Sequence, residues 1–155
     1  MEAFLSKVSE YNLFNYLLPG AVFVYLIDMF GDAHLLHENV LINIFMLYFV
    51  GMVMSRVASL VIEPILLKIK FIRYAPYKDY LKAIKVDEKI PTLLLENNTY
   101  RTFIAVFTVA AIILIYESLC EHILNKGAGV WVCIVMLILF LSAFRKQTDF
   151  IRKSV

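Results

Sequence analysis

Four long apolar stretches, at 11–30, 40–62, 103–120 and 127–144, limit most strongly what this chain can fold into. A helix that crosses about 30 Å of hydrocarbon needs about 20 mostly apolar residues. The 61% hydrophobic and 18% charged content depart from the roughly 45–50% and 25% of soluble domains. The pattern predicts an all-α integral membrane protein with four transmembrane helices. It excludes a disordered chain, a secreted disulfide scaffold and an ordinary cytosolic enzyme.

The basic residues indicate how the chain is oriented, because cytoplasmic connections collect Lys and Arg. Most of the 15 basic residues fall in the segment between the second and third stretches, in the C-terminal tail or at the N-terminus. They are Lys7, Lys68, Lys70, Arg73, Lys78, Lys82, Lys85, Lys89, Arg101, Arg145, Lys146, Arg152 and Lys153. The two short loops carry only Lys126. This predicts a multi-pass protein of a bacterial inner membrane, with both termini and the central segment in the cytoplasm.

The predicted organisation is two transmembrane hairpins, at 1–62 and 103–144, joined by a cytoplasmic region at 63–102 and followed by a basic tail at 145–155. Pro64 ends or kinks the second span. Within the cytoplasmic region the sequence predicts a basic helix beginning after Pro64, a helix over 77–85 and a short helix over 91–97. About forty residues are too few to bury a core alone, so this region must pack on a copy of itself, on the membrane or on a partner.

Small residues recur every fourth position in the second span, at Gly51, Ser55 and Ser59. This spacing lets two helix backbones approach closely in a membrane. The neighbouring helix could equally belong to the same chain or to a second subunit, so a homo-oligomer is one expected assembly.

Charged and polar residues inside the spans are candidates for a pore or gate, because burying them in lipid is costly. Arg56 and Glu63 fall on roughly the same helical face of the second span and could form an inner gate. Arg56 could instead extend to lipid phosphates. Asp28 and Asn43 are the corresponding candidates toward the outer end, where solvation at the interface is the plainer explanation for Asp28.

Two groups in the cytoplasmic region are candidates for binding a partner or ligand. Lys78, Lys82 and Lys85 form a basic set that would attract an acidic protein or an anionic nucleotide. The second group precedes the third span and is rich in hydrogen-bonding side chains; it comprises Asn97, Asn98, Tyr100 and Arg101. A helix cap with interfacial Tyr and Arg anchors explains the second group equally simply.

Catalytic signatures are missing from the sequence: there is no Gly-rich phosphate loop, no His-Glu-x-x-His and no nucleophile elbow. His34, His37 and His122 lie in the outer loops without the ligand spacing of a metal site. We therefore expect a protein that is not an enzyme, with no cofactor, no metal and no direct binding of nucleic acid.

Two short motifs carry a resemblance. The run 11–20, with Asn15-Tyr16-Leu17 followed by Pro19-Gly20, begins the first span, and the run 97–102 precedes the third. Together they resemble a loose group of small bacterial four-span membrane proteins found with phage-defence systems. The resemblance implies a membrane subunit that either permeabilises the cell or anchors a cytosolic sensor.

Three functions remain open at this point. The first is an oligomeric channel-like or membrane-disrupting effector in anti-phage defence, triggered through its basic cytoplasmic region. The second is a membrane anchor or sensor subunit that docks a cytosolic partner. The third is a small proton-coupled transporter, for which the carboxylates lie far from the usual mid-bilayer position.

Overall fold

The structure is a computed structural model that describes residues 13–87, 89–121 and 125–155, and every regular element among them is helical. The all-α class is therefore confirmed. The elements are η1 (Leu13–Leu17), α2 (Leu18–Phe30), α3 (Val40–Val57), η2 (Ala58–Ile62), α4 (Glu63–Lys68), α5 (Tyr77–Val86), α6 (Lys89–Glu121) and α7 (Asn125–Ser154), where η marks a π-helical turn.

Three helices are long and apolar enough to cross a membrane, which identifies the chain as a membrane protein by length and composition. They span Val40–Lys68, Lys89–Cys120 and Gly127–Ser154. The predicted first span is represented by a shorter apolar helix, Asn15–Phe30, and positions 11–12 of that span lie outside the described residues. A fourth crossing therefore stays a prediction.

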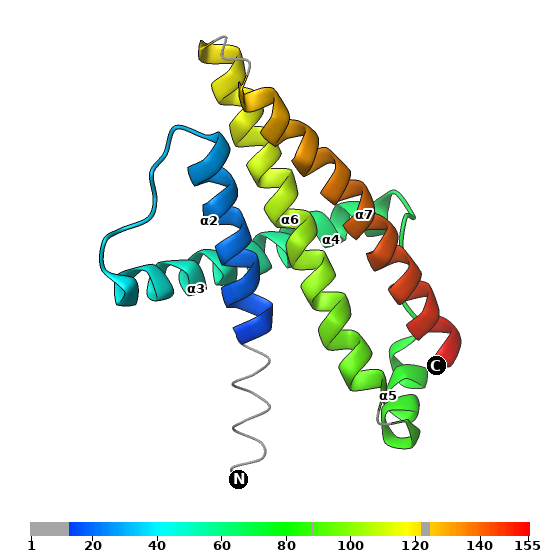
Figure 1. The fold of residues 1–155 in the computed structure, drawn as a ribbon. Coiled ribbons are helices and arrows are strands. Elements are labelled where there is room, and N and C mark those ends of the chain that lie inside the picture. Colours follow the sequence, from blue (N-terminus) through cyan, green and yellow to red (C-terminus); the bar gives the residue numbers. More distant parts are fainter. Residues whose placement is uncertain (1–12, 88, 122–124) are drawn as a thin grey trace.

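The two longest helices, α6 and α7, lie side by side and antiparallel (Figure 1). A stack of rings joins them: the Phe140 ring of α7 lies 4.6 Å from that of Phe103 and 5.6 Å from that of Phe107, measured between centroids. Tyr100 adds a tilted contact to Phe140 at 6.1 Å. Such pairs contribute about 0.5–1.5 kcal/mol each beyond the area they bury, so this stack fixes the register of the pair.

The shorter helix α2 packs on the α6–α7 pair through Phe23, Val24 and Ile27, which share one buried cluster with residues of α3, α6 and α7. The helix that begins as α3 runs across the view in Figure 1, whereas α2, α6 and α7 run from one end of the molecule to the other. Its first half projects from the bundle. Only Gly51 and Met54 of α3 are buried.

The crossing of the first two helices depends on two glycines. A Cβ atom built on Gly51 would lie 1.7 Å from the carbonyl oxygen of Tyr16, and one on Gly20 would lie 1.8 Å from that of Leu47. The backbones are thus in direct contact, as in other small-residue crossings. The predicted neighbour of Gly51 is therefore a helix of the same chain.

Two of the four prolines, Pro19 and Pro64, each follow a π-helical turn that ends two residues earlier. The turn over Leu13–Leu17 precedes Pro19, and the turn over Ala58–Ile62 precedes Pro64. A proline ring clashes with the carbonyl four residues before it, and the wider turn opens that position. Pro64 therefore does not end the second helix, which continues to Lys68.

The helices expected within the region 63–102 agree with the structure in part. The helix expected over 77–85 is confirmed as α5, Tyr77–Val86. The separate short helix expected over 91–97 is wrong, because these residues form the first turns of α6, a continuous helix of 33 residues. At 1.5 Å per residue α6 is about 50 Å long, which exceeds the hydrocarbon thickness by about 20 Å. Positions 63 and 102 thus lie inside continuous helices.

The second helix ends in a tight cap at Lys70, whose φ of 58° is left-handed. Phe71 N–H donates to the Leu66 carbonyl at 2.9 Å, and Lys70 N–H donates to that of Leu67 at 3.0 Å. This is the hydrogen-bond pattern of a Schellman motif, in which glycine normally occupies the left-handed position. The Leu66 and Phe71 side chains meet in one apolar cluster, which completes the motif.

Lys70→Gly should stabilise the protein by about 1 kcal/mol, because glycine removes the cost of the left-handed backbone. Lys68→Gly, two residues earlier and still helical, should destabilise it by a similar amount. Detergent-induced unfolding followed by circular dichroism measures both. A Lys70→Gly protein less stable than the parent would contradict this account of the cap.

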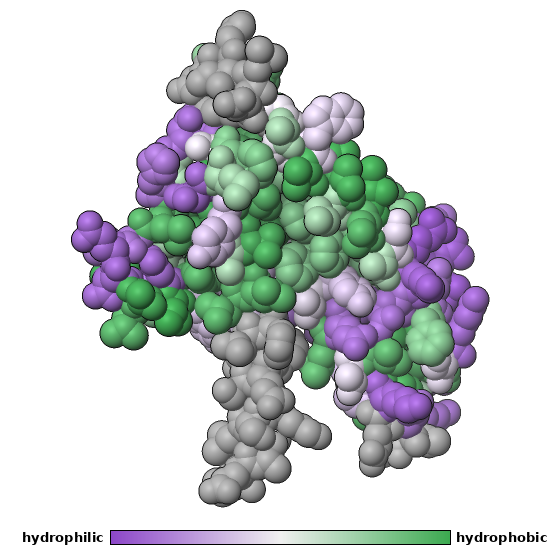
Figure 2. All heavy atoms as spheres, viewed as in Figure 1, coloured by the Kyte–Doolittle hydropathy of each residue, from purple (hydrophilic) through white to green (hydrophobic). Residues whose placement is uncertain are grey.

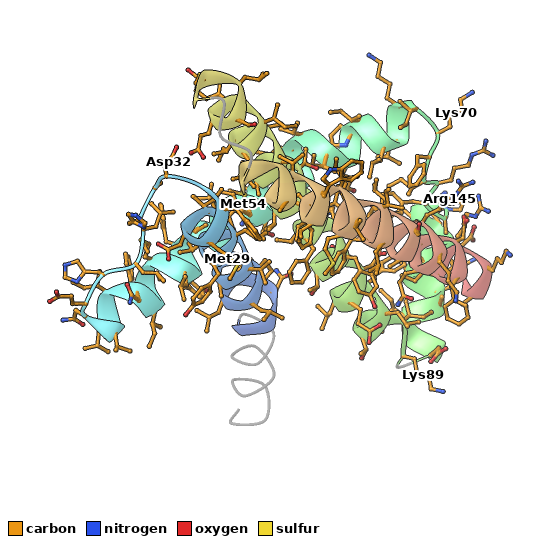
Figure 3. All side chains as sticks on the ribbon, turned by 45° about the horizontal axis from the view of Figure 1, so that its top comes forward. Met29, Asp32, Met54, Lys70, Lys89 and Arg145 are labelled. Atoms are coloured by element: carbon orange, nitrogen blue, oxygen red, sulfur yellow. The ribbon has the colours of Figure 1, made fainter. Side chains whose placement is uncertain are left out.

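Polar residues collect at the ends of the molecule. Figure 2 shows the apolar surface over the middle and hydrophilic side chains over the end that carries α5 and the C-terminus. In Figure 3, Lys70, Lys89 and Arg145 lie toward that end and Asp32 lies at the other. We call the end with α5 and the C-terminus the basic end.

Candidate functional site

An open pocket of about 340 Å³ lies at the basic end, between the loop after α4, helix α5 and the first turns of α6. Its wall combines two charged groups, three phenols, two amides and three apolar side chains. They are Glu63, Tyr74, Ala75, Tyr77, Tyr80, Leu94, Asn97, Asn98, Arg101 and Ile151. A concave, mainly apolar site with a few convergent polar groups is the usual form of a small-ligand site.

An ion pair between Glu63 of α4 and Arg101 of α6 lies in this wall. The Arg101 Nη1 atom donates to Glu63 Oε2, and the two side chains are 16% and 20% exposed, respectively. The pair joins α4, at the start of the segment between the second and third apolar stretches, to α6, which forms the end of that segment. It therefore ties the long helix Val40–Lys68 to α6 at the level of the pocket.

The π-turn explains why Glu63 faces inward whereas Arg56 does not. In a regular α-helix, residues seven apart lie on nearly the same face. The π-turn over 58–62 takes up an extra residue, which rotates the following helix by about 100°. Arg56 is accordingly exposed, and it shares neither a face nor an ion pair with Glu63 in the described structure.

Tyr74 lies beside the Glu63–Arg101 pair, from the loop that follows α4. Burial raises the pKa of Tyr74 well above its ordinary value, and the carboxylate of Glu63 raises it further. The guanidinium of Arg101 acts in the opposite direction and lowers the pKa of Tyr74, but burial and Glu63 outweigh it. Tyr74 therefore stays a neutral phenol beside the ion pair. Burial also raises the pKa of Tyr80, which keeps a second neutral phenol in the wall.

The four polar residues predicted before the third span have three different roles in the structure. Asn98 and Arg101 line the pocket. Asn97 is buried, and its amide meets the Thr148 hydroxyl of α7 with contacts of 3.2 and 3.3 Å. Tyr100 packs its ring on Phe140. Asn97 and Tyr100 thus join α6 to α7, while Asn98 and Arg101 are available to a ligand.

Lys78 and Lys82 of α5 lie away from the pocket. Tyr80, Ala83 and Ile84 are the half-buried face of this helix, whereas Lys78 and Lys82 are exposed on the other side. Lys85 occupies the same helical face by its position, and its side chain lies outside the described part of the structure. Lys78 and Lys82 do not contribute charge to the pocket wall.

The other pore candidates lie far from the pocket, near the ends of α2 and α3. Asp28 pairs with His34 at 3.6 Å. Asn43 accepts from the His37 backbone N–H and donates to the His37 carbonyl, each at 2.8 Å, so it holds the loop onto the start of α3. Asp28 and Asn43 thus make local contacts at the ends of α2 and α3, and their role in a pore stays a prediction.

The remaining packing candidates, Ser55 and Ser59, are half-buried. The Ser59 hydroxyl donates to the carbonyls of Ser55 and Arg56 in its own helix, both at 3.1 Å. Of the three small residues predicted to pack, Gly51 makes the helix crossing. The buried side of this helix continues through Met54 and Ala58 instead.

Sequence analysis missed the three tyrosines of the pocket, Tyr74, Tyr77 and Tyr80. Their spacing of three residues in an otherwise polar segment was the available signal, because such spacing gathers side chains on one side of a turn or helix. Among the described residues, no group of three or more His, Cys, Asp or Glu side chains could hold a metal ion. Comparison with protein-family models, curated proteins and solved structures finds no match to this chain.

Proposed function

We propose that this chain is a membrane-embedded sensor subunit whose pocket, on the cytoplasmic side, receives a small ligand. The observation that carries the proposal is the pocket itself. Its occupant would touch the long helix Val40–Lys68 at Glu63, α6 at Arg101 and the separate helix α5 at Tyr80. Two of these helices are long and apolar enough to cross a membrane. Ligand binding would therefore act directly on the membrane-spanning part.

The distribution of charge supports a cytoplasmic position for the pocket in a bacterial inner membrane. The loops and tail at the basic end carry most of the Lys and Arg residues, as cytoplasmic connections do. This orientation also leaves both termini in the cytoplasm. The resemblance to defence-associated membrane proteins supplies the setting, in which the sensor passes its signal to a cytosolic partner.

The orientation can be tested with single cysteines in a chain whose Cys120 and Cys133 are replaced by serine. We expect an impermeant maleimide to label His34→Cys in intact spheroplasts, and Lys78→Cys only after permeabilisation. Both side chains are exposed, so accessibility within the protein does not limit either reaction. Labelling of Lys78→Cys in intact spheroplasts would overturn the cytoplasmic assignment.

The sensor function predicts that the pocket is needed for protection against phage. In cells that carry the chain with its neighbouring genes, Asn98→Ala should abolish protection at unchanged membrane abundance. Lys82→Ala, on the opposite side of the adjacent helix, should leave protection intact. Plaque counts measure both variants. Equal protection by Asn98→Ala and the parent would rule out a sensing role for the pocket.

A second candidate function is an oligomeric channel-like effector, and the exposed first half of α3 favours it. Leu41 and Phe45 are 76% and 71% exposed, and neighbouring Ile44 and Phe49 are also uncovered. Packing of copies through this segment would bring together several copies of Arg56. Membrane depolarisation on expression, lost in Arg56→Ala, would support the effector. A strictly monomeric particle in detergent would exclude it.

A further inference from the structure

The Glu63–Arg101 pair has unused bonding capacity on both sides. A guanidinium has five N–H donors and a carboxylate has about four acceptor sites. In the described structure Arg101 donates from Nη1 to one oxygen of Glu63, and its buried Nε has no hydrogen-bond partner. A buried donor left unpaired costs about 1–3 kcal/mol. The pair is thus satisfied in charge and incomplete in hydrogen bonds.

These two are the only charged side chains among the described residues that line the pocket. A ligand with a single charge would meet a like charge beside the opposite one, which cancels most of the gain. A ligand with both charges can align its dipole against that of the pair. The attraction of its anion to Arg101 and the attraction of its cation to Glu63 then add together. Partial burial of the site weakens the screening of both attractions by water.

The aromatic wall adds a preference for the cationic end. Tyr77 and Tyr80 present phenol rings from α5, and Tyr74 presents a third from the preceding loop. The faces of such rings attract ammonium groups, by about 0.5–1 kcal/mol at exposed sites and more when desolvated. Asn98 provides amide N–H donors near Arg101 for the anionic end.

We propose that the pocket binds a phosphoethanolamine group, a zwitterion with an ammonium two carbons from a phosphate ester. The phosphate accepts from Arg101 and Asn98, and the ammonium donates to Glu63 among the tyrosine rings. This inference rests on the proposed sensor function and names its ligand. The group could come from a soluble molecule or from a lipid headgroup. The pocket lies where α6 turns apolar, since Phe103 is already buried in the bundle core.

The soluble arm of the test uses the purified full chain in maltoside micelles, titrated by calorimetry with O-phosphoethanolamine. We expect saturable binding, with ethanolamine and glycerol phosphate each weaker by about tenfold or more, because each supplies charge of one sign only. Tyr77→Ala should weaken binding by about three- to tenfold. This residue is 72% exposed, so its removal leaves the fold intact. Lys82→Ala is the matched control and should bind as the parent does.

The lipid arm uses native mass spectrometry of the chain released from nanodiscs of equal phosphatidylethanolamine and phosphatidylglycerol content. Retained phosphatidylethanolamine that is lost in Tyr77→Ala, together with no soluble binding, identifies the lipid as the source. Ethanolamine or glycerol phosphate binding as tightly as phosphoethanolamine overturns the proposal. So does the absence of binding in both arms. If the proposal fails in either way and Asn98→Ala still abolishes protection, the sensor function stands and only the proposed ligand is wrong.

Discussion

Gly51→Ala should lower the thermal stability of this protein by about 10 °C. A methyl group at this position would lie 1.7 Å from the carbonyl oxygen of Tyr16, and 2.6 Å from its carbonyl carbon. Both atoms belong to a helix backbone, which cannot rotate away as a side chain can. Overpacking of this kind costs about 3 kcal/mol, and about 2–4 °C is lost per kcal/mol in a protein of this size.

The melting temperature is measured on detergent-solubilised protein. It is the temperature of heating at which half of the protein is no longer monodisperse. Gly127→Ala is the matched control, because nothing lies within 4 Å of the added methyl group. It should melt at the temperature of the parent or slightly above, as alanine favours a helix. Melting of Gly51→Ala within 2 °C of this control would contradict the direct backbone contact.

The second large effect is expected from Arg101→Met, which should destabilise the protein by about 2–3 kcal/mol. The substitution leaves the Glu63 carboxylate, only 20% exposed, without its cationic partner. Unpaired buried charges are costly, and the partial exposure here places the effect below the 3–5 kcal/mol of fully buried pairs. Arg56→Met is the matched control. It removes an exposed arginine and should change the free energy of unfolding by less than about 0.5 kcal/mol.

A double-mutant cycle separates the pair from the packing of the arginine stem. Glu63→Gln combined with Arg101→Met removes both charges, so the double variant should be more stable than the sum of the single losses implies, by at least about 1 kcal/mol. Unfolding in increasing sodium dodecyl sulfate, followed by circular dichroism, gives each value. Additive losses would mean that the two residues do not interact.

Much of the fold could be predicted from the sequence because hydropathy reports membrane crossings directly. The apolar stretches at 40–62, 103–120 and 127–144 all fall in helices long enough to span, and α5 begins at the expected Tyr77. The continuous α6 was missed because Pro91 and the polar residues that follow it resemble a break. Proline is tolerated in the first turn of a helix, where its missing N–H has no partner to lose.

The candidate site was harder to predict because it depends on contacts between distant residues. Glu63 and Arg101 are 38 residues apart, and each was singled out for a different role. The π-turn moved Glu63 off the face of Arg56, and nothing in the local composition indicated that rotation. Asn43 was assigned to a pore by its apolar surroundings, whereas it holds the preceding loop through the His37 backbone.

The π-turns have a consequence for how this sequence tolerates insertions and deletions. Twelve residues separate Gly51 from Glu63, and in a regular α-helix they would lie about 120° apart. With one residue absorbed by the turn over 58–62, the difference falls to about 20°, so the helix crossing and the ion pair share one side. A chain with an alanine at position 64 has no need of the wider turn. Such a chain would keep the Gly51 crossing and the Glu63–Arg101 pair on one side of the helix only if one residue between positions 51 and 63 were deleted. We therefore expect loss of the proline to be accompanied by deletion of one residue in this segment.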